Sequence, residues 1–371
     1  MEQESVTQTP SLGPGSIAQA SVSGGPAFAL SATEWISIQT YVIDALVLPT
    51  TLDALKTSIG SGAPSDMSDF SQLVAAYGGI HDHVTTWQND TFPQSVSLAS
   101  DIHNYAQQAP TYYNPILPLA QKLTANPDDQ TAKDELTAIL GLLSSKATEY
   151  QKNAASVAAK IKDFADQTQS DKVKLSGTDG KGGLQKYYND KYGATSTEVI
   201  TITEQLKAEK LVLDAANADY NHDVIVAATT PTYAWVWPIG TVAAAIVAGI
   251  YGDKAVKALE RVRAAQQQIN SLSDKLAADA NLMIAINSVE SGLTNILGPL
   301  NAALPIIQKI QGVWGAIADD LNNIINLIKT NIQEALPIIM NLGVQSAINA
   351  WTAVGQEADA YRVNAYVTVN K

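Results

Sequence analysis

Four histidines are the residues of the chain whose type best suits metal chemistry. His81 and His83 flank Asp82, whereas His103 and His222 stand apart from them. A helical zinc site needs two histidines one turn apart, and a His-Asp-His sequence on a helix directs its two imidazoles to different sides. We therefore interpret His81, His83 and His103 as ordinary surface or capping histidines and predict no metal site.

A glycine-rich loop, SGTDGKGG at residues 176–183, contains a Gly-Lys pair like that of phosphate-binding loops. The Gly-x4-Gly-Lys-[Ser/Thr] spacing is missing, and Gly182 stands where Ser or Thr would hold magnesium. The chain has no cysteine, which removes thiol chemistry, and no Glu-x-x-His pair, which carboxylate-bridged metal sites of helical bundles need. We predict a turn here, no catalytic residue and no cofactor. An enzyme built on a helical bundle is the weakest alternative.

The composition indicates which elements carry these residues. Of 371 residues, 46% are hydrophobic and only 16% are charged, against about 25% in an average soluble protein. Aromatic residues make up 6%, and the abundance of Ala, Ile and Leu favours helices over sheets, so we expect an all-α fold. The net charge of −13 would repel nucleic acid and anionic lipid at long range. We exclude nucleic acid as a partner, and any membrane contact must rest on apolar burial.

Apolar residues recur at helical spacing along most of the chain. The sequence SATE, beginning at Ser31, supplies a capping box that predicts a helix start, and Pro93 predicts a break in the helical stretch 65–108. Residues 128–175 contain no proline and predict one helix, which at 1.5 Å per residue would be roughly 70 Å long. A heptad seam is expected over residues 259–293. We predict an elongated bundle of about five long helices.

The remaining stretches are expected to be less regular or more buried. Residues 1–30 favour a flexible tail, and they contain no ordinary secretory signal, which leaves export by another route or through an omitted signal open. The charge-poor runs 291–308 and 335–356 carry Pro, Asn, Gln or Ser at short intervals, so we interpret them as buried bundle helices and not as lipid-facing ones. The end of the chain, residues 361–371, is β-prone.

One run, residues 224–252, contains no charged residue and lies between Asp223 and Asp253. Pro231 and Pro238 divide it into two apolar arms joined by an aromatic turn, which predicts a hairpin. Each arm is shorter than the roughly 20 residues of a membrane-spanning helix, although clustered Trp and Tyr suit a bilayer interface. A hairpin buried in the protein's own core is the alternative. Because helical patterns lead into the run and out of it, we interpret it as a hydrophobic head, a hairpin or β-tongue inserted between two long helices.

This plan resembles the cytolysin A superfamily of α-helical pore-forming toxins. It is most similar to the multi-component branch with the Bacillus haemolysin BL and non-haemolytic enterotoxins and tripartite relatives in Gram-negative bacteria. The resemblance is carried by residues 237–262, WPIGTVAAAIVAGIYGDKAVKALERV, within a chain of matching size and helix order. It implies a secreted soluble bundle whose head rearranges at the target-cell lipid membrane. It also implies self-oligomerisation and partner toxin components in a pore on the host cell.

Carried to this sequence, the resemblance implies helical bundle residues at 31–223 and 253–371, with the head at 224–252. The residues implied to enter the membrane are apolar or aromatic: Val224, Ile225, Val226, Tyr233, Trp235, Val236, Trp237, Ile239, Val242, Ile246, Val247, Ile250 and Tyr251. The prolines and glycines of the run are implied to act as its hinge: Pro231, Pro238, Gly240, Gly249 and Gly252. Because two prolines interrupt it, the run departs from the pattern of a hydrophobic hairpin that spans the membrane fully. The alternative from another class is a coiled-coil structural or adaptor protein whose apolar hairpin docks a protein partner.

Overall fold

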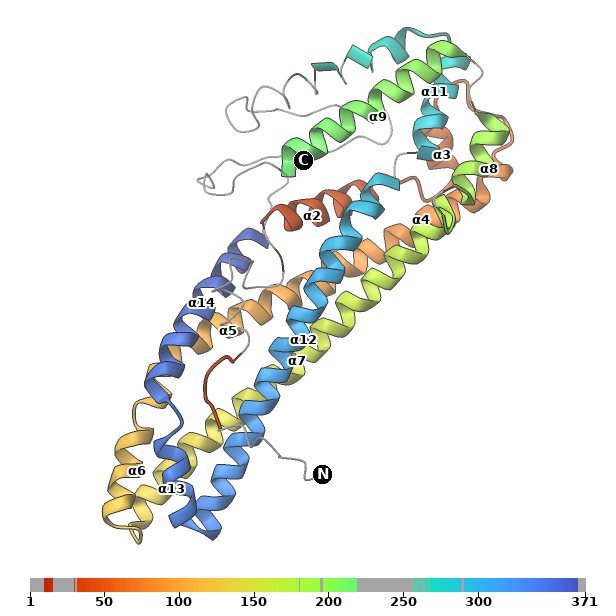
Figure 1. The fold of residues 1–371 in the computed structure, drawn as a ribbon. Helices are drawn as coiled ribbons and strands as arrows, with labels where there is room; N and C mark the ends of the chain where they lie inside the picture. Colours follow the sequence, from red (N-terminus) through yellow and green to blue (C-terminus); the bar gives the residue numbers. More distant parts are fainter. Residues whose placement is uncertain are drawn as a thin grey trace, which may run out of the picture. The chain divides into compact units, whose positions relative to one another are not determined.

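The computed structural model describes residues 10–15, 30, 32–179, 181–193, 196–218, 257, 260–261, 264–265, 267–287 and 290–365. Within these ranges every regular element is a helix, which confirms the all-α prediction (Figure 1). Five described helices have 22 or more residues, in agreement with the predicted number of long helices. They are α5 (Phe92–Tyr113), α7 (Gln130–Ser176), α9 (Thr197–Ala218), α12 (Glu290–Thr330) and α14 (Val344–Ala365).

The chain divides into two compact units. Unit 1 contains Met1–Leu30, Pro93–Ile161 and Ala302–Val363, and unit 2 contains Ser31–Phe92, Lys162–Asn301 and Asn364–Lys371. Helices α7 and α12 each contribute one part to unit 1 and the other part to unit 2.

Unit 1 is built from α5, α14, the first part of α7 and the later part of α12, with α6 (Ile116–Ala125) against α13 (Ile332–Met340). Its centre is a set of aromatic rings. The rings of Trp314 and Trp351 stack with centroids 4.7 Å apart, and Tyr105 meets Trp314 edge-on, also at 4.7 Å. Aromatic pairs at such separations add to the free energy gained by burial. The charge-poor run 335–356 supplies part of this core, as expected for a buried bundle helix.

Helix α7 closely follows the predicted range. Asp129 Oδ1 accepts a hydrogen bond of 3.0 Å from the Ala132 amide and so caps the first turn. The helix ends before Gly177, whose φ of +79° suits glycine, and the loop 176–183 is a turn as predicted. The apolar positions that step by three or four residues along the helix are buried: Leu136, Leu140, Leu143, Ala147, Tyr150, Ala154, Val157, Ile161 and Phe164.

Unit 2 collects shorter helices around a second aromatic core. These are α2 (Ala32–Leu46), α3 (Leu52–Ile59), η1 (Ser68–Phe70), α4 (Ser71–Thr86), η2 (Trp87–Thr91), α8 (Gly183–Tyr192), α9 and α11 (Asp274–Asn287). Trp87 stacks on Phe164 with centroids 4.5 Å apart, and its ring lies 6.4 Å from that of Trp35. Helix α2 lies against α4 and α9, and α11 lies against α3, α8 and α9.

Three expectations about helix breaks were wrong. Pro93 does not interrupt the helical backbone, because a π-helical turn precedes it and the Phe92 amide donates to Trp87 O, so that the missing Pro93 donor is tolerated. The expected seam 259–293 breaks at residues 272–273, where Ser273 begins the new helix α11 and its carbonyl accepts from the Ala277 amide. The β-prone residues 361–365 are helical, as the last turn of α14.

The expectation of a flexible tail does not hold for residues 10–15. Leu12 is 1% exposed and lies in unit 1 without belonging to a helix. Its carbonyl accepts hydrogen bonds from Trp351 Nε1 and from Tyr113 Oη. A polar composition alone could not predict that one leucine in this stretch finds an apolar site with two buried donors.

Candidate functional site

The apolar run 224–252 lies outside the described residues, and so do all the predicted membrane-inserting and hinge residues. Their roles therefore stay predictions. The structure does describe the chain on both sides of the run, up to Ala218 at the end of α9 and again from residue 257. The contacts between these two flanking segments are therefore part of the described structure.

An apolar cluster joins the segments on the two sides of the run. It combines residues of α9 with residues of the helical stretch that ends at residue 271 and with α11. The buried members are Val199, Ile202, Ala265, Ile269 and Ala280, and Leu206, Leu272, Leu276, Ala277 and Ile284 pack against them. The break at residues 272–273 lets α11 return onto the same cluster, which one straight helix could not do. Apolar burial therefore joins the described segments that precede and follow the run in sequence.

An ion pair lies nearer in sequence to the run than the residues of this cluster. Arg261 donates from Nη2 to Glu209 Oε2 at 2.8 Å and from Nε to Glu209 Oε1, across 52 positions of sequence. This is the bidentate geometry in which guanidinium and carboxylate groups bind most strongly. The Glu209 carboxylate raises the pKa of Arg261 further, so the guanidinium stays charged. Sequence reasoning missed this pair, because opposite charges on two helices do not reveal which of them face each other.

His83 and Asp171 form a hydrogen-bonded pair within unit 2. His83 Nδ1 lies 2.7 Å from Asp171 Oδ2, and the Asp171 side chain is 1% exposed. Burial raises the pKa of Asp171, and the hydrogen bond from His83 opposes that shift. Burial, together with the nearby Asp171 charge, raises the pKa of Tyr41. His81 lies 3.9 Å from Asp82 at the surface, so the two imidazoles have different surroundings, as predicted.

His103 also holds elements of unit 1 together. Its Nδ1 lies 3.0 Å from Gly355 O, and its Nε2 lies 2.7 Å from Gln107 Nε2. The interpretation as ordinary surface or capping histidines therefore holds for His81 and is wrong for His83 and His103, which bridge helices distant in sequence. His222 lies outside the described residues. No group of three or more His, Cys, Asp or Glu suited to a metal ion occurs in the described part of the chain.

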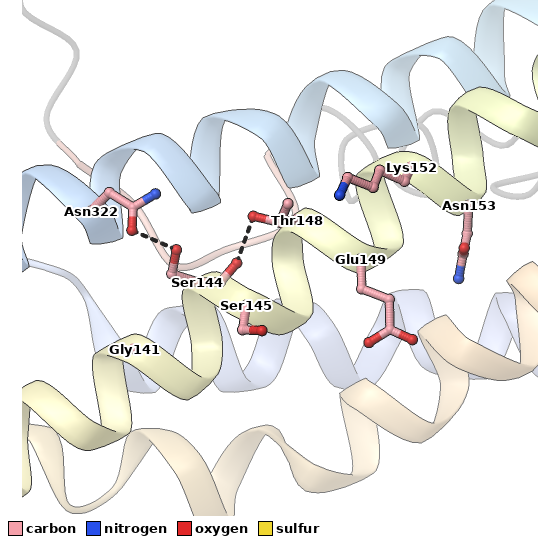
Figure 2. Close-up of a pocket in the computed structure, with 8 residues that line it drawn as sticks. All are labelled: Gly141, Ser144, Ser145, Thr148, Glu149, Lys152, Asn153 and Asn322. Atoms are coloured by element: carbon pink, nitrogen blue, oxygen red, sulfur yellow. Dashed lines mark hydrogen bonds between the residues drawn. The ribbon is translucent and has the colours of Figure 1, made fainter.

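A polar groove of about 560 Å³ lies between α7 and α12 in unit 1 (Figure 2). It is lined by Gly141, Ser144, Ser145, Thr148, Glu149, Lys152, Asn153 and Asn322. Ser144 Oγ donates to Asn322 Oδ1 at 2.8 Å, and Thr148 Oγ1 donates to Ser144 O at 2.9 Å. The Ser144 hydroxyl therefore has the side-chain amide oxygen of Asn322 as an acceptor.

None of the described helices combines the length and the apolar character required to cross a membrane. The charge-poor run 291–308 lies in α12, and the run 335–356 lies in α13 and α14 with the connection between them.

Comparison with known proteins finds a family that is similar to part of the chain. The sequence model of the Bacillus haemolytic enterotoxin (HBL) family matches residues 68–208. These residues include α7 and the part of α9 that contributes Val199, Ile202 and Leu206 to the cluster. Over these residues the chain is similar to the Bacillus HBL family. The predicted resemblance to multi-component α-helical toxins is thereby confirmed.

Other relatives extend the match to most of the chain. It is 25% identical over 365 residues to the pesticidal crystal protein Cry6Ba of Bacillus thuringiensis, covering 91% of this chain and 89% of that protein. The Bacillus cereus HblL1 toxin component has the same fold, with a TM-score of 0.52 at 16% identity over 98% of this chain and 100% of the other. Soluble SmhA of the tripartite α-pore-forming toxin Smh from Serratia marcescens gives a TM-score of 0.55 at 13% identity, over 98% and 99%. The named relatives are toxin proteins and not enzymes, in agreement with the prediction.

Proposed function

We propose that the chain is a component of a secreted, multi-part pore-forming toxin that converts from a soluble to a membrane-bound form. The observation that carries this proposal is the placement of an uncharged run, 224–252, between two segments held together by the Glu209–Arg261 pair and an apolar cluster. The fold shared with HblL1 and SmhA supports it. The partners in this proposal are the target-cell lipid membrane, further copies of the chain and other toxin components.

In this proposal residues 224–252 are the head, and residues 31–223 and 253–371 form the bundle that carries it. The arms 224–230 and 239–251 would enter the lipid, while Pro231 and Pro238 flank the aromatic turn between them. Burial of both arms could release on the order of tens of kcal/mol at about 25 cal/mol per Å² of apolar surface. That free energy is large enough to offset the cost of undocking the head from a bundle. Because the net charge is −13, attraction to anionic lipid does not contribute.

Dye release from phosphatidylcholine liposomes tests this function, with the protein alone and with the proteins encoded beside it. Ala244→Asp and Val247→Lys place a charge in the second arm, at a cost of about 2.5 to 3.5 kcal/mol at the centre of a bilayer. We expect both variants to reduce release at least tenfold. Leu142→Lys is the matched control, since Leu142 is 47% exposed on α7 and a charge there should leave release unchanged.

Circular dichroism and thermal melting must show that each variant is folded, because a head packed in the soluble form would also be destabilised by a charge. Folded head variants that release dye as fast as the wild type would contradict the role of the run. A protein that neither binds nor permeabilises vesicles, with or without its neighbours, would instead favour the adaptor alternative.

A further inference from the structure

Residues 10–15, Pro-Ser-Leu-Gly-Pro-Gly, lie in unit 1 as an extended segment and not as part of a helix. Leu12 and Pro14 are buried, whereas Ser11 and Gly15 are exposed. The segment therefore presents one large aliphatic side chain and one proline to the helices, while Pro10 and Gly13 are half-buried. This alternation of buried and exposed residues is typical of a peptide bound in a groove, because only some of its side chains contact the surrounding protein.

Two buried donors converge on a single carbonyl of this segment. Trp351 Nε1 donates to Leu12 O at 2.7 Å, and Tyr113 Oη donates to the same oxygen at 2.9 Å. Both donor side chains are fully buried. Tyr113 Oη also lies 2.6 Å from Tyr105 Oη, which orients it. A buried donor without an acceptor is costly, so the helices favour an occupant that brings a carbonyl to this point.

Further contacts fix the segment at its edges. The Ser11 amide lies 3.3 Å from Asp320 Oδ2 on α12, and Gly15 has a φ of +49°, which permits a turn after Pro14. Gly13 passes beside Ala347 on α14, where an added Cβ would lie 3.9 Å from the Ala347 Cβ. Three helices, α5, α12 and α14, thus form the site, and all of them are distant from the segment in sequence.

The helices that form the site have a core of their own. Tyr105, Trp314 and Trp351 are packed against one another through ring contacts between α5, α12 and α14, none of which involves the segment. The segment has no helical hydrogen bonds, and its described hydrogen bonds to the helices are those of Ser11 and Leu12. Opening such a segment costs less free energy than unfolding the helices beneath it.

We propose that unit 1 contains a binding site for an extended peptide with a buried leucine, which in this structure is filled by the chain's own residues 10–15. The segment is a separable ligand, and the same sequence supplied as a peptide binds once the internal copy has left. The internal copy competes at the high effective concentration of a tethered ligand, so the site of the unaltered chain is closed to the peptide. This site is independent of the function proposed for residues 224–252.

The test uses the full-length chain with Leu12→Asp. An ionised carboxylate cannot be buried without a partner, so the internal segment leaves the site. A fluorescein-labelled peptide of residues 8–17 should then bind with at least tenfold higher affinity than it binds the wild-type chain, as measured by fluorescence anisotropy. The same peptide carrying the Leu12→Asp change should bind neither protein. If the folded variant binds both peptides equally, or binds neither, the proposed site does not exist.

A second measurement does not depend on that variant. Leu12→Cys and Leu140→Cys each place a single thiol at a position no more than 1% exposed, in a chain without cysteine. We expect a maleimide to label Cys at position 12 at least 100-fold faster than at position 140, because only the segment opens without global unfolding. Equal labelling rates would show that the segment is an inseparable part of the core, and the proposal would be wrong.

Discussion

Arg261 and Glu209 join the described segments on the two sides of the uncharged run, with Arg261 Nη2 2.8 Å from Glu209 Oε2 and a second hydrogen bond from Arg261 Nε. Glu209→Ala should lower the free energy of unfolding by about 1 to 2 kcal/mol, because the pair is bidentate and the carboxylate is largely buried. A double-mutant cycle with Arg261→Ala, followed by urea denaturation, measures the coupling.

The surface pair Lys186–Asp190 is the matched control for that cycle. Both side chains are more than half exposed, and pairs of this kind contribute about 0.3 to 0.5 kcal/mol. A coupling for Glu209–Arg261 no larger than that of Lys186–Asp190 would mean that the pair does not fasten the two segments.

Helix α7 provides a test of its buried face. Leu140 is fully buried and Leu142, two residues later, is 47% exposed. Leu140→Ala should cost about 2 to 5 kcal/mol, since it removes contacts and leaves a cavity. Leu142→Ala should change stability by less than about 0.5 kcal/mol. Thermal or urea unfolding measures both, and similar losses for the two variants would show that the packing face of α7 is assigned wrongly.

The buried carboxyl of Asp171 should make the free energy of unfolding fall as the pH rises, which is opposite to the usual effect of an aspartate. Its pKa is raised above 3.8 by burial, with His83, Lys174 and Tyr41 as the charged or titratable groups facing it. The folded state therefore binds this proton more readily than the unfolded state, and the associated stability is lost as the pH rises above 3.8. We expect the stability of the wild type relative to Asp171→Asn to fall between pH 4 and 7 in urea titrations.

Asp129 supplies a comparison of opposite sign. Hydrogen bonds from the Ala132 amide and from Lys122 lower the pKa of Asp129 below 3.8. The stability of the wild type relative to Asp129→Asn should therefore be lost as the pH falls below 3.8. If both differences followed the same direction with pH, the environment assigned to Asp171 would be incorrect.

A disulfide can test the docking of the N-terminal segment. Gly13→Cys with Ala347→Cys places the two Cβ atoms about 3.9 Å apart, within the range of natural disulfides. We expect the bond to form on mild oxidation and to stabilise the protein by about 2 to 4 kcal/mol, an increase that reduction reverses. Mass spectrometry and thermal melting give the readouts.

Gly13→Cys with Gly141→Cys is the control pair for this disulfide. A Cβ at Gly141 has nothing within 4 Å, so no disulfide should form there. Equal cross-linking of both pairs would indicate that residue 13 is not held at Ala347.

The sequence alone determined the features that depend on local periodicity. The apolar positions of α7 step by three or four residues, so its buried face and its length followed from helical geometry, and the loop 176–183 followed from its glycines. The relation to multi-component toxins was also visible in the order of helices and in the uncharged run, because both are linear properties of the chain. The continuous helix through Pro93 and the break at residues 272–273 were harder to predict, since proline can follow a π-helical turn and a heptad pattern can continue across a bend.

Only the tertiary structure decided which distant groups meet. Glu209 joins Arg261 across 52 positions, His83 joins Asp171 across 88, and Leu12 accepts from Trp351 across 339. Each of these polar groups alone is typical of a solvated surface or a loose tail. Their roles arise because burial removes water as the competing hydrogen-bond partner. The packing of the helices, which no local pattern specifies, then decides which protein group takes the place of water.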